Sequence, residues 1–474
     1  MSTFGSINTA YSGLSAARAA MEIAGQNIAN ANTTGYTRQR VDTSPVAAPA
    51  NVGLAASTTP VAGQGVSTDS ITQLGDKMAD NQVRASAAQA GYASVRSDAL
   101  SAIESNMGEP GTEGISSALH TLWANFSDVA NQPNTAAPAN VLLQNATVLT
   151  GKIAAGYTAM DNQWTVTRGT VDSMAADLNT NATQVAILNG SIRSTMAAGG
   201  NANELIDQRS QLVNNIASLA GGTVRDKGDG TIDVVVGGNA IVSGTTTRTV
   251  VVSGAARMNG AAASPVSVEW ADKPGQPISP DGGKLAGAIS VLAAANGGTG
   301  GAIAESAESY NRLAQNLAST VNAVHQSGAT PSGAAGGEFF HITAGVPAAQ
   351  GLSVVPKSKD DLATGTAGAG AFDGSNATKL SELGNATGGP GDTWSATVTT
   401  TAVAAKSAIL HGDLAESVSA AAVKSQASSS GVDLDEENVH ILAAQRAYQA
   451  AARVMSAIDE TLDTLINRTG MVGR

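Results

Sequence analysis

Two stretches decide the fold of this 474-residue chain: 7–28, INTAYSGLSAARAAMEIAGQNI, and 441–466, ILAAQRAYQAAARVMSAIDETLDTLI. In both, apolar residues recur at alternating four- and three-residue steps, a spacing that lines one narrow face of a helix. On the first stretch they are Ile7, Tyr11, Leu14, Met21 and Ile28, and on the second Ile441, Tyr448, Ala452, Met455, Leu462 and Ile466. Because such a face must be buried against another helix, the sequence predicts two helices made for pairing.

The same stripes have a simpler interpretation, in which each is the core face of an ordinary domain helix. Two matched stripes at opposite termini instead favour helices built for docking or polymerisation. No proline occurs before Pro45 or after Pro390 to interrupt them.

Short motifs within the two stretches carry a family resemblance. Residues 27–39, NIANANTTGYTRQ, resemble the amino-terminal signature of bacterial flagellar axial proteins, the superfamily of rod, hook and hook-associated proteins. Residues 444–454, AQRAYQAAARV, are similar to the carboxy-terminal signature, and 463–467, DTLIN, fit its tail. These motifs identify the superfamily rather than the member.

Further motifs narrow the resemblance to the family of the first hook-associated protein, which forms the hook–filament junction. Typical of that family are 37–39 (TRQ), 430–437 (SGVDLDEE), 204–213 (ELIDQRSQLV) and 373–380 (DGSNATKL). In the last of these, Thr378 and Lys379 replace the usual small apolar pair. Residues 337–340, GEFF, are a weaker fifth match. A hook or rod protein is the alternative within the superfamily, and the motifs at 37–39 and 430–437 argue against it.

The resemblance implies a structural protein that polymerises on the hook through its terminal helices, paired as an inner coiled coil lining a channel. The small residues Ala16, Ala17, Ala20 and Ala24 would allow the helices to approach closely. Residues expected to meet within and between subunits are Ile7, Tyr11, Leu14, Met21 and Ile28 with Ile441, Tyr448, Met455, Leu462 and Ile466.

The resemblance also implies partners and a location. The partners are further copies of the chain, the hook protein, the second hook-associated protein and an export chaperone that covers the last helix. The chaperone-binding candidates are Leu462, Leu465 and Ile466. The location is the extracellular flagellum, reached by the flagellar type III export route without a cleaved signal.

Composition limits the chemistry that the chain can support. Aromatic residues make up only 3% of the chain, so the cores must consist mainly of Ala, Val, Leu and Ile. The net charge is −12 and there is no basic cluster, which argues against a nucleic-acid partner. The absence of cysteine excludes thiol catalysis and disulfides. Neither a secretory signal peptide nor an apolar run long enough to span a membrane is present in the sequence.

Periodicity along the chain predicts a mainly α fold with β insertions and discontinuous domains. The terminal helices (1–45 with 433–474) form a coiled-coil assembly domain, and 46–220 with 286–432 form a body of long helices. Helices are expected at about 6–31, 77–105, 115–129, 139–196, 201–220 and 287–325 and from about 435, and 32–75 is expected to be irregular and extended. The body includes a small β element at about 330–400, with strands expected at 339–342, 352–355 and 394–399, and helix resuming at about 402. The β-branched runs at 231–236 and 249–252, with 266–270, predict an inserted outer β domain at 221–285.

No residue cluster predicts catalysis, a cofactor or a metal ion. The histidines are scattered without metal-ligand spacing, and Asp226, Asp229 and Asp233 do not match a calcium loop. Two other functions remain as alternatives. A peptidoglycan hydrolase would need a carboxylate pair, for which Glu269 and Asp272 are the candidates. An adhesin would use the β insert at 221–285. The sequence therefore predicts a protein that is not an enzyme.

Overall fold

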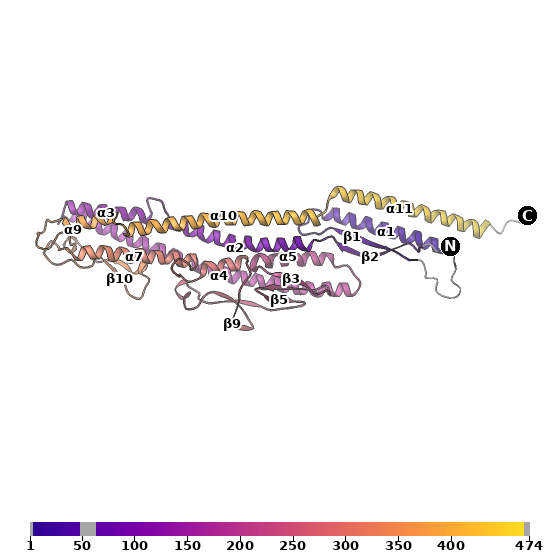
Figure 1. The fold of residues 1–474 in the computed structure, drawn as a ribbon, viewed down its shortest axis with the longest axis horizontal. Helices are drawn as coiled ribbons and strands as arrows, with labels where there is room; N and C mark the ends of the chain where they lie inside the picture. Colours follow the sequence, from indigo (N-terminus) through magenta and orange to yellow (C-terminus); the bar gives the residue numbers. More distant parts are fainter. Residues whose placement is uncertain (1–2, 48–62, 469–474) are drawn as a thin grey trace, which may run out of the picture.

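The computed structural model describes residues 3–47 and 63–468 and shows an elongated rod, with both chain ends at the same end (Figure 1). Residues 1–2 and 469–474 of the predicted terminal domain, and 48–62 of the predicted body, lie outside the described residues. The mainly α fold class with β insertions and long terminal helices is confirmed.

Long helices running along the rod form most of the molecule. In its middle, α2 (Lys77–Met107) packs along α10 (Pro390–Ser430), while the 62-residue α4 (Ala136–Ala197) contacts α3, α5 and α7. At about 1.5 Å per residue, α4 is about 90 Å long. The shorter helical elements are α3 (Ile115–Asn131), α5 (Asn203–Ala220), α6 (Gly283–Leu292), α7 (Ala302–Gln326), α8 (Ala348–Gly351), α9 (Ser375–Glu382), η1 (Met258–Gly260), η2 (Lys359–Asp361) and η3 (Leu383–Asn385).

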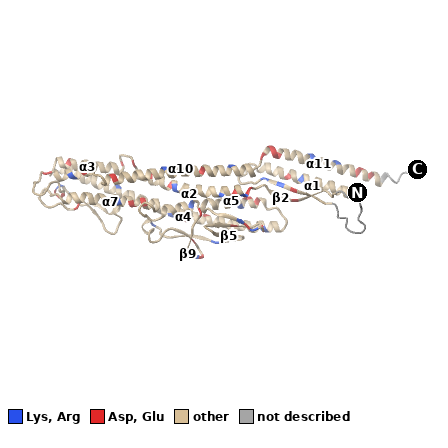
Figure 2. Ribbon diagram, in the orientation of Figure 1, with Lys and Arg blue, Asp and Glu red and all other residues tan. Residues whose placement is uncertain are grey.

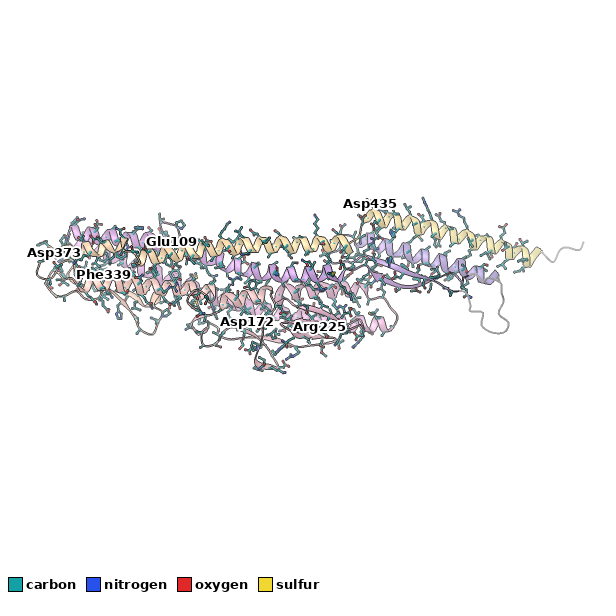
Figure 3. The ribbon with its side chains drawn as sticks, viewed as in Figure 1. Glu109, Asp172, Arg225, Phe339, Asp373 and Asp435 are labelled. Atoms are coloured by element: carbon teal, nitrogen blue, oxygen red, sulfur yellow. The ribbon has the colours of Figure 1, made fainter. Side chains whose placement is uncertain are left out.

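The core runs the length of the body and consists mostly of aliphatic residues, as the composition predicts. Two buried tryptophans are held in the core by hydrogen bonds. Trp164 donates its indole N–H to the Leu292 carbonyl at 3.1 Å, and Trp394 donates to the Glu109 carboxylate at 3.0 Å. At the end far from the termini, Phe126 packs on Phe339, with ring centroids 5.2 Å apart (Figure 3).

The β insert lies along one side of the rod and consists of two antiparallel sheets. One has the order β3 (Thr223–Asp226), β4 (Ile232–Val236), β5 (Asn239–Ser243), β6 (Thr246–Thr247), and the other β7 (Val250–Ser253), β8 (Ser267–Trp270), β9 (Lys273–Ile278). Two asparagines of α4 attach the sheets to the body. Asn179 exchanges hydrogen bonds with the backbone of Val250, and the buried Asn189 bonds the backbone of Ile232.

Two predictions about local structure are wrong. Residues 394–399 are not a strand but part of α10, which begins at Pro390 rather than near 402. The alternation WSATVT resembles a strand, but proline is favoured at a helix start, and the buried Trp394 packs on Tyr310 with ring centroids 5.0 Å apart. The single helix expected from 287 to 325 is also wrong, because residues 293–301 separate α6 from α7.

Two small antiparallel pairs complete the fold. β10 (Phe340–Ile342) and β11 (Leu352–Val354) form the small β element expected within 330–400. β1 (Gln39–Pro45) and β2 (Val66–Gln73) form a ribbon beside the terminal helices α1 (Thr3–Asn30) and α11 (Leu434–Asp463), and a π turn, η4 (Thr464–Arg468), follows α11. The sequence predicted the β1–β2 region only as extended chain.

Candidate assembly interface

The terminal helices pair with each other within one chain. α1 and α11 lie side by side and run in opposite directions (Figure 1). At the middle of the pair, a Cβ built on Gly13 would lie 4.0 Å from the Cβ of Ala451. Contact this close requires small residues on both helices, as the alanine content of α1 predicts.

The predicted interface residues are only partly covered by this pairing. Ile7, Leu14, Met21 and Ile28 of α1 are half-buried, while Tyr11 is 61% exposed. On α11, the half-buried residues are Ile441, Tyr448, Met455 and Leu462, whereas Ile466 is 74% exposed.

The most buried positions of α1 belong to the neighbouring stripe of small residues. Ala10, Ala17, Ala24 and Asn27 are all buried; Ala10 and Asn27 come one position before Tyr11 and Ile28 of the predicted stripe. The sequence reasoning missed this shift because it weighted large apolar side chains, whereas close packing at a helix crossing selects small ones. The large residues of the predicted stripe therefore lie at the margin of the pair, although Ile23, outside that stripe, is buried.

α11 also leaves large apolar side chains uncovered in the single chain. Val439, Leu442 and Val454 are 64%, 54% and 52% exposed, respectively, and Arg446 lies on the same side of the helix, seven residues after Val439. α11 therefore has one face on α1 and another that no described part of the chain covers.

The start of α11 is capped by Asp433. The Asp433 carboxylate accepts hydrogen bonds from the backbone N–H groups of Asp435 and Glu436, which satisfies the helix end. Asp435, Glu436 and Glu437 place negative charge at the positive end of the helix dipole (Figure 3 labels Asp435).

A buried polar cluster, which we call the hub, joins the terminal pair to the chain that follows α1. Asn27, at the end of α1, donates to the Glu437 carboxylate at 3.1 Å and accepts from the Tyr36 hydroxyl at 2.8 Å. Its side chain also exchanges hydrogen bonds with the backbone of Gln39. Arg38 forms ion pairs with Glu437 and Glu436, both at 2.7 Å. Asn27 and Glu437 are only 1% and 2% exposed, so the contacts of Asn27 with Glu437 and with the Gln39 backbone are shielded from water. The Arg38–Glu436 pair lies at the edge of the hub, because the Glu436 side chain is 60% exposed.

The hub continues into α5 of the body. Asn203 donates to the Gln39 side chain at 3.0 Å, and Glu204 accepts from Gln26 at 2.9 Å. Asp207 accepts from the Thr37 backbone and from Gln73. The motifs at 27–39, 204–213 and 430–437, far apart in the sequence, therefore meet at one point.

Burial and nearby charges at the hub shift the pKa values of Tyr36 and Asp207. Burial, with the nearby carboxylates of Glu204, Asp207 and Glu437, raises the pKa of Tyr36 to about 12, so its hydroxyl stays a hydrogen-bond donor. Burial also raises the pKa of Asp207 above its ordinary value. Gly35 adopts a φ of +80°, and a side chain there would collide with Gln211 of α5, so this glycine is required by the turn.

The residues considered for other chemistry are engaged in the β insert. Glu269 accepts from the Gly275 backbone and Ser267, and Asp272 is paired with Arg248, so hydrogen bonds lower the pKa of both carboxyls. Asp226, Asp229 and Asp233 each accept from nearby backbone N–H groups. Within 3–47 and 63–468, no group of acidic residues and histidines is arranged to hold a metal ion.

Lys and Arg are scattered along the rod rather than gathered on one surface (Figure 2). Among the residues that the structure describes, no helix is both long and apolar enough to cross a membrane.

Antiparallel terminal helices joined through a polar hub to a rod of long helices define a flagellar axial protein. Family models agree: "Flagella basal body rod protein" matches residues 7–37, and "Flagellar basal body rod FlgEFG protein C-terminal" matches 425–468. The model of the flagellar hook-associated protein FlgK helical domain matches residues 100–340. The chain belongs to the FlgK hook-associated protein family, which confirms the resemblance inferred from the sequence.

Individual relatives support this assignment. The chain is 29% identical to flagellar hook-associated protein 1 of Bacillus subtilis over the full length of both chains. It is 28% identical to the Escherichia coli protein of that name, over 48% of this chain and 41% of that protein. The structure of the hook junction protein FlgK from Burkholderia pseudomallei matches with a TM-score of 0.61 at 14% identity, covering 73% of this chain and 99% of that one. The chain is thus a structural protein of the flagellar hook–filament junction and belongs in the extracellular flagellum.

Proposed function

We propose that this protein polymerises on the hook through the outer faces of its paired terminal helices. The observation that carries the proposal is the uncovered apolar surface of the pair. α1 keeps a half-buried stripe from Ile7 to Ile28, and α11 exposes Val439, Leu442 and Val454. Burying a side chain of this size is worth about 1.5–3 kcal/mol, so neighbouring copies that cover these faces would stabilise one another.

The arrangement also accounts for the way that copies would join. The two uncovered stripes lie on different helices, so α1 of one copy can contact α11 of a second copy while its own α11 contacts a third. Such heterologous contacts extend into helical assemblies or rings instead of stopping at a dimer. We propose Ile7, Tyr11, Leu14, Met21, Ile28, Ile441, Tyr448, Met455, Leu462 and Ile466 as residues that such contacts bury more completely than the single chain does.

The partners beyond further copies follow from the family. We propose contacts with the hook protein on one side and the second hook-associated protein on the other. An export chaperone would cover the end of α11 and the turn after it, where Leu465 and Ile466 are 53% and 74% exposed and Leu462 is half-buried.

We also propose that the chain divides into three domains, with 1–45 and 433–474 as the assembly domain, 46–220 and 286–432 as the body, and 221–285 as an outer insert. We propose that the protein has no enzymatic activity, because the family is structural.

A matched pair of substitutions tests the assembly face. Val454→Glu places a charge among the exposed apolar side chains of α11, whereas Val166→Glu makes the same substitution at a 70% exposed position on α4 of the body. We expect cells with Val454→Glu to build hooks but release flagellin monomers into the medium, and cells with Val166→Glu to build filaments. Normal filaments with Val454→Glu, while the variant is exported at wild-type levels, would show that this face is not used.

A further inference from the structure

The seam between α1 and α11 contains a repeating pattern of small residues. On α1, the face nearest α11 and the β1–β2 ribbon follows four- and three-residue steps through Ser6, Ala10, Gly13, Ala17, Ala20, Ala24 and Asn27. On α11, a seven-residue series runs through Glu437, Ala444, Ala451 and Ile458. Asn27 and Glu437 are the polar members of these two series.

Small residues by themselves only weakly specify the register in which α1 and α11 pair. If α11 slides by seven residues along α1, small residues again meet: in one direction Gly13 faces Ala444, and in the other Ala20 faces Ala451 while Gly13 faces Ile458. A seven-residue slide moves the helix by about 10 Å. Coiled coils resolve this ambiguity with a polar residue at one core position, which fixes the register at some cost in stability.

Asn27 and Glu437 are polar core residues of this kind, and their geometry suits a role in fixing the register. The Asn27 amide donates to the Glu437 carboxylate at 3.1 Å, and both residues are almost fully buried. Gly13 lies 14 residues before Asn27, and Ala451 lies 14 residues after Glu437. Because the helices are antiparallel, the Gly13–Ala451 contact and the Asn27–Glu437 contact belong to the same alignment. Arg38 provides the charge that compensates Glu437, at 2.7 Å.

We propose that Asn27 and Glu437 form a register lock that selects one of several heptad alignments of the terminal helices. In the shifted alignments, Glu437 would face Ala20 or leave the helix pair, and its carboxylate would lose both Asn27 and Arg38. Where Glu437 faces Ala20, it is a buried charge without its partners, which is strongly unfavourable. Where Glu437 leaves the pair, Asn27 faces Ala444 and loses its acceptor, so a buried amide is left without that hydrogen bond. The lock acts within one chain and does not depend on polymerisation.

The competing explanation is that the connections alone fix the register. The Arg38 backbone N–H donates to the Ser430 carbonyl at 3.0 Å, and only residues 431–433 separate α10 from α11. These constraints remain when the lock is removed, so the two explanations predict different results.

The natural absence of cysteine allows a direct test by disulfide cross-linking. The full-length chain with Gly13→Cys and Ala451→Cys reports the native alignment, since a Cβ separation of 4.0 Å suits a disulfide. Gly13→Cys with Ala444→Cys, or with Ile458→Cys, reports alignments shifted by one heptad in either direction. Each pair is oxidised in the otherwise unchanged chain, in Asn27→Ala/Glu437→Ala, and in Asn27→Asp, which keeps the side-chain shape but removes the donor to Glu437.

In the unchanged chain, we expect only the 13–451 pair to cross-link. In both lock variants, we expect one or both shifted pairs to cross-link as well, a displacement of seven residues. Continued exclusive cross-linking of 13–451 in both variants would overturn the lock and assign the register to the connections. Loss of all cross-links would also overturn it, because the two residues would then hold the helices together rather than choose between alignments.

Discussion

At the residue scale, the hub contains an ion pair, Arg38 with Glu437, that is largely buried. Arg38→Ala removes the cation from Glu437, whose side chain is only 3% exposed. Removing one partner of a buried pair costs about 3–5 kcal/mol, and we expect the lower end because Arg38 is partly exposed. Native-state hydrogen exchange should show faster exchange in the first turns of α11, with α4 unchanged.

A nearby surface ion pair is the control for this change. Arg40 pairs with Asp42 at 2.9 Å, but the Arg40 side chain is 61% exposed. Pairs of this kind contribute about 0–1 kcal/mol, so Arg40→Ala should leave the exchange of α11 almost unchanged. Equal effects of the two substitutions would contradict the importance assigned to the hub.

A second residue-scale prediction concerns pH. His325 is 1% exposed, its Nδ1 lies 2.8 Å from the Gly337 carbonyl, and its Nε2 accepts the Ala363 N–H at 3.0 Å. Both contacts are satisfied by the neutral ring, and burial lowers the pKa of His325. The unfolded chain, with a histidine pKa of about 6.5, binds more protons below that pH. The stability that His325 contributes is therefore present above about pH 6.5 and is lost as the pH falls below it.

Thermal unfolding of the wild type and His325→Gln between pH 7.5 and 5 checks this prediction. We expect the wild type to lose more stability than the variant over this range, although the variant is less stable at pH 7.5. His341, which is exposed and bonds Glu338, provides His341→Gln as a control that keeps the wild-type slope. Equal slopes for the wild type and His325→Gln would contradict the prediction.

At the element scale, two glycines of α4 differ in what surrounds them. A Cβ at Gly156 would collide with the Tyr310 ring, whereas nothing lies within 4 Å of one at Gly151. Gly151→Ala should stabilise the protein by about 1 kcal/mol through helix propensity. Gly156→Ala should destabilise it by about 1–3 kcal/mol through overpacking. Denaturant unfolding of the two variants measures both effects, and a gain in stability from Gly156→Ala would contradict the packing described for Tyr310.

The elements also show where sequence reasoning succeeds. Strong periodicity and clear end signals predicted α1, α2, α4, α5 and α11 to within a few residues. The prediction of a strand at 394–399 was wrong, because the alternating pattern of these residues belongs to helix α10, in which Trp394 is buried. The convergence of 27–39, 204–213 and 430–437 on the hub could not be predicted, because these contacts depend on how the helices are arranged in space. Polar residues within heptad series, such as Asn27 and Glu437, were the available signal.

At the scale of the whole molecule, the buried core and the uncovered apolar surface lie in different parts of the rod. The body buries its long core and carries the β insert, while the terminal pair at one end keeps apolar surface that the described chain does not cover (Figure 1). The hub connects the two parts, so the direction in which the terminal pair points is fixed relative to the body. An assembly built from such units can transmit a fixed orientation from hook to filament.

The central claim is that the terminal pair carries assembly at the junction. The most direct test is flagellin secretion and motility in cells whose chain lacks residues 435–474, with export of the truncated chain verified in the medium. The account predicts cells that are non-motile, have hooks and shed unpolymerised flagellin. Normal filaments on these cells would contradict it.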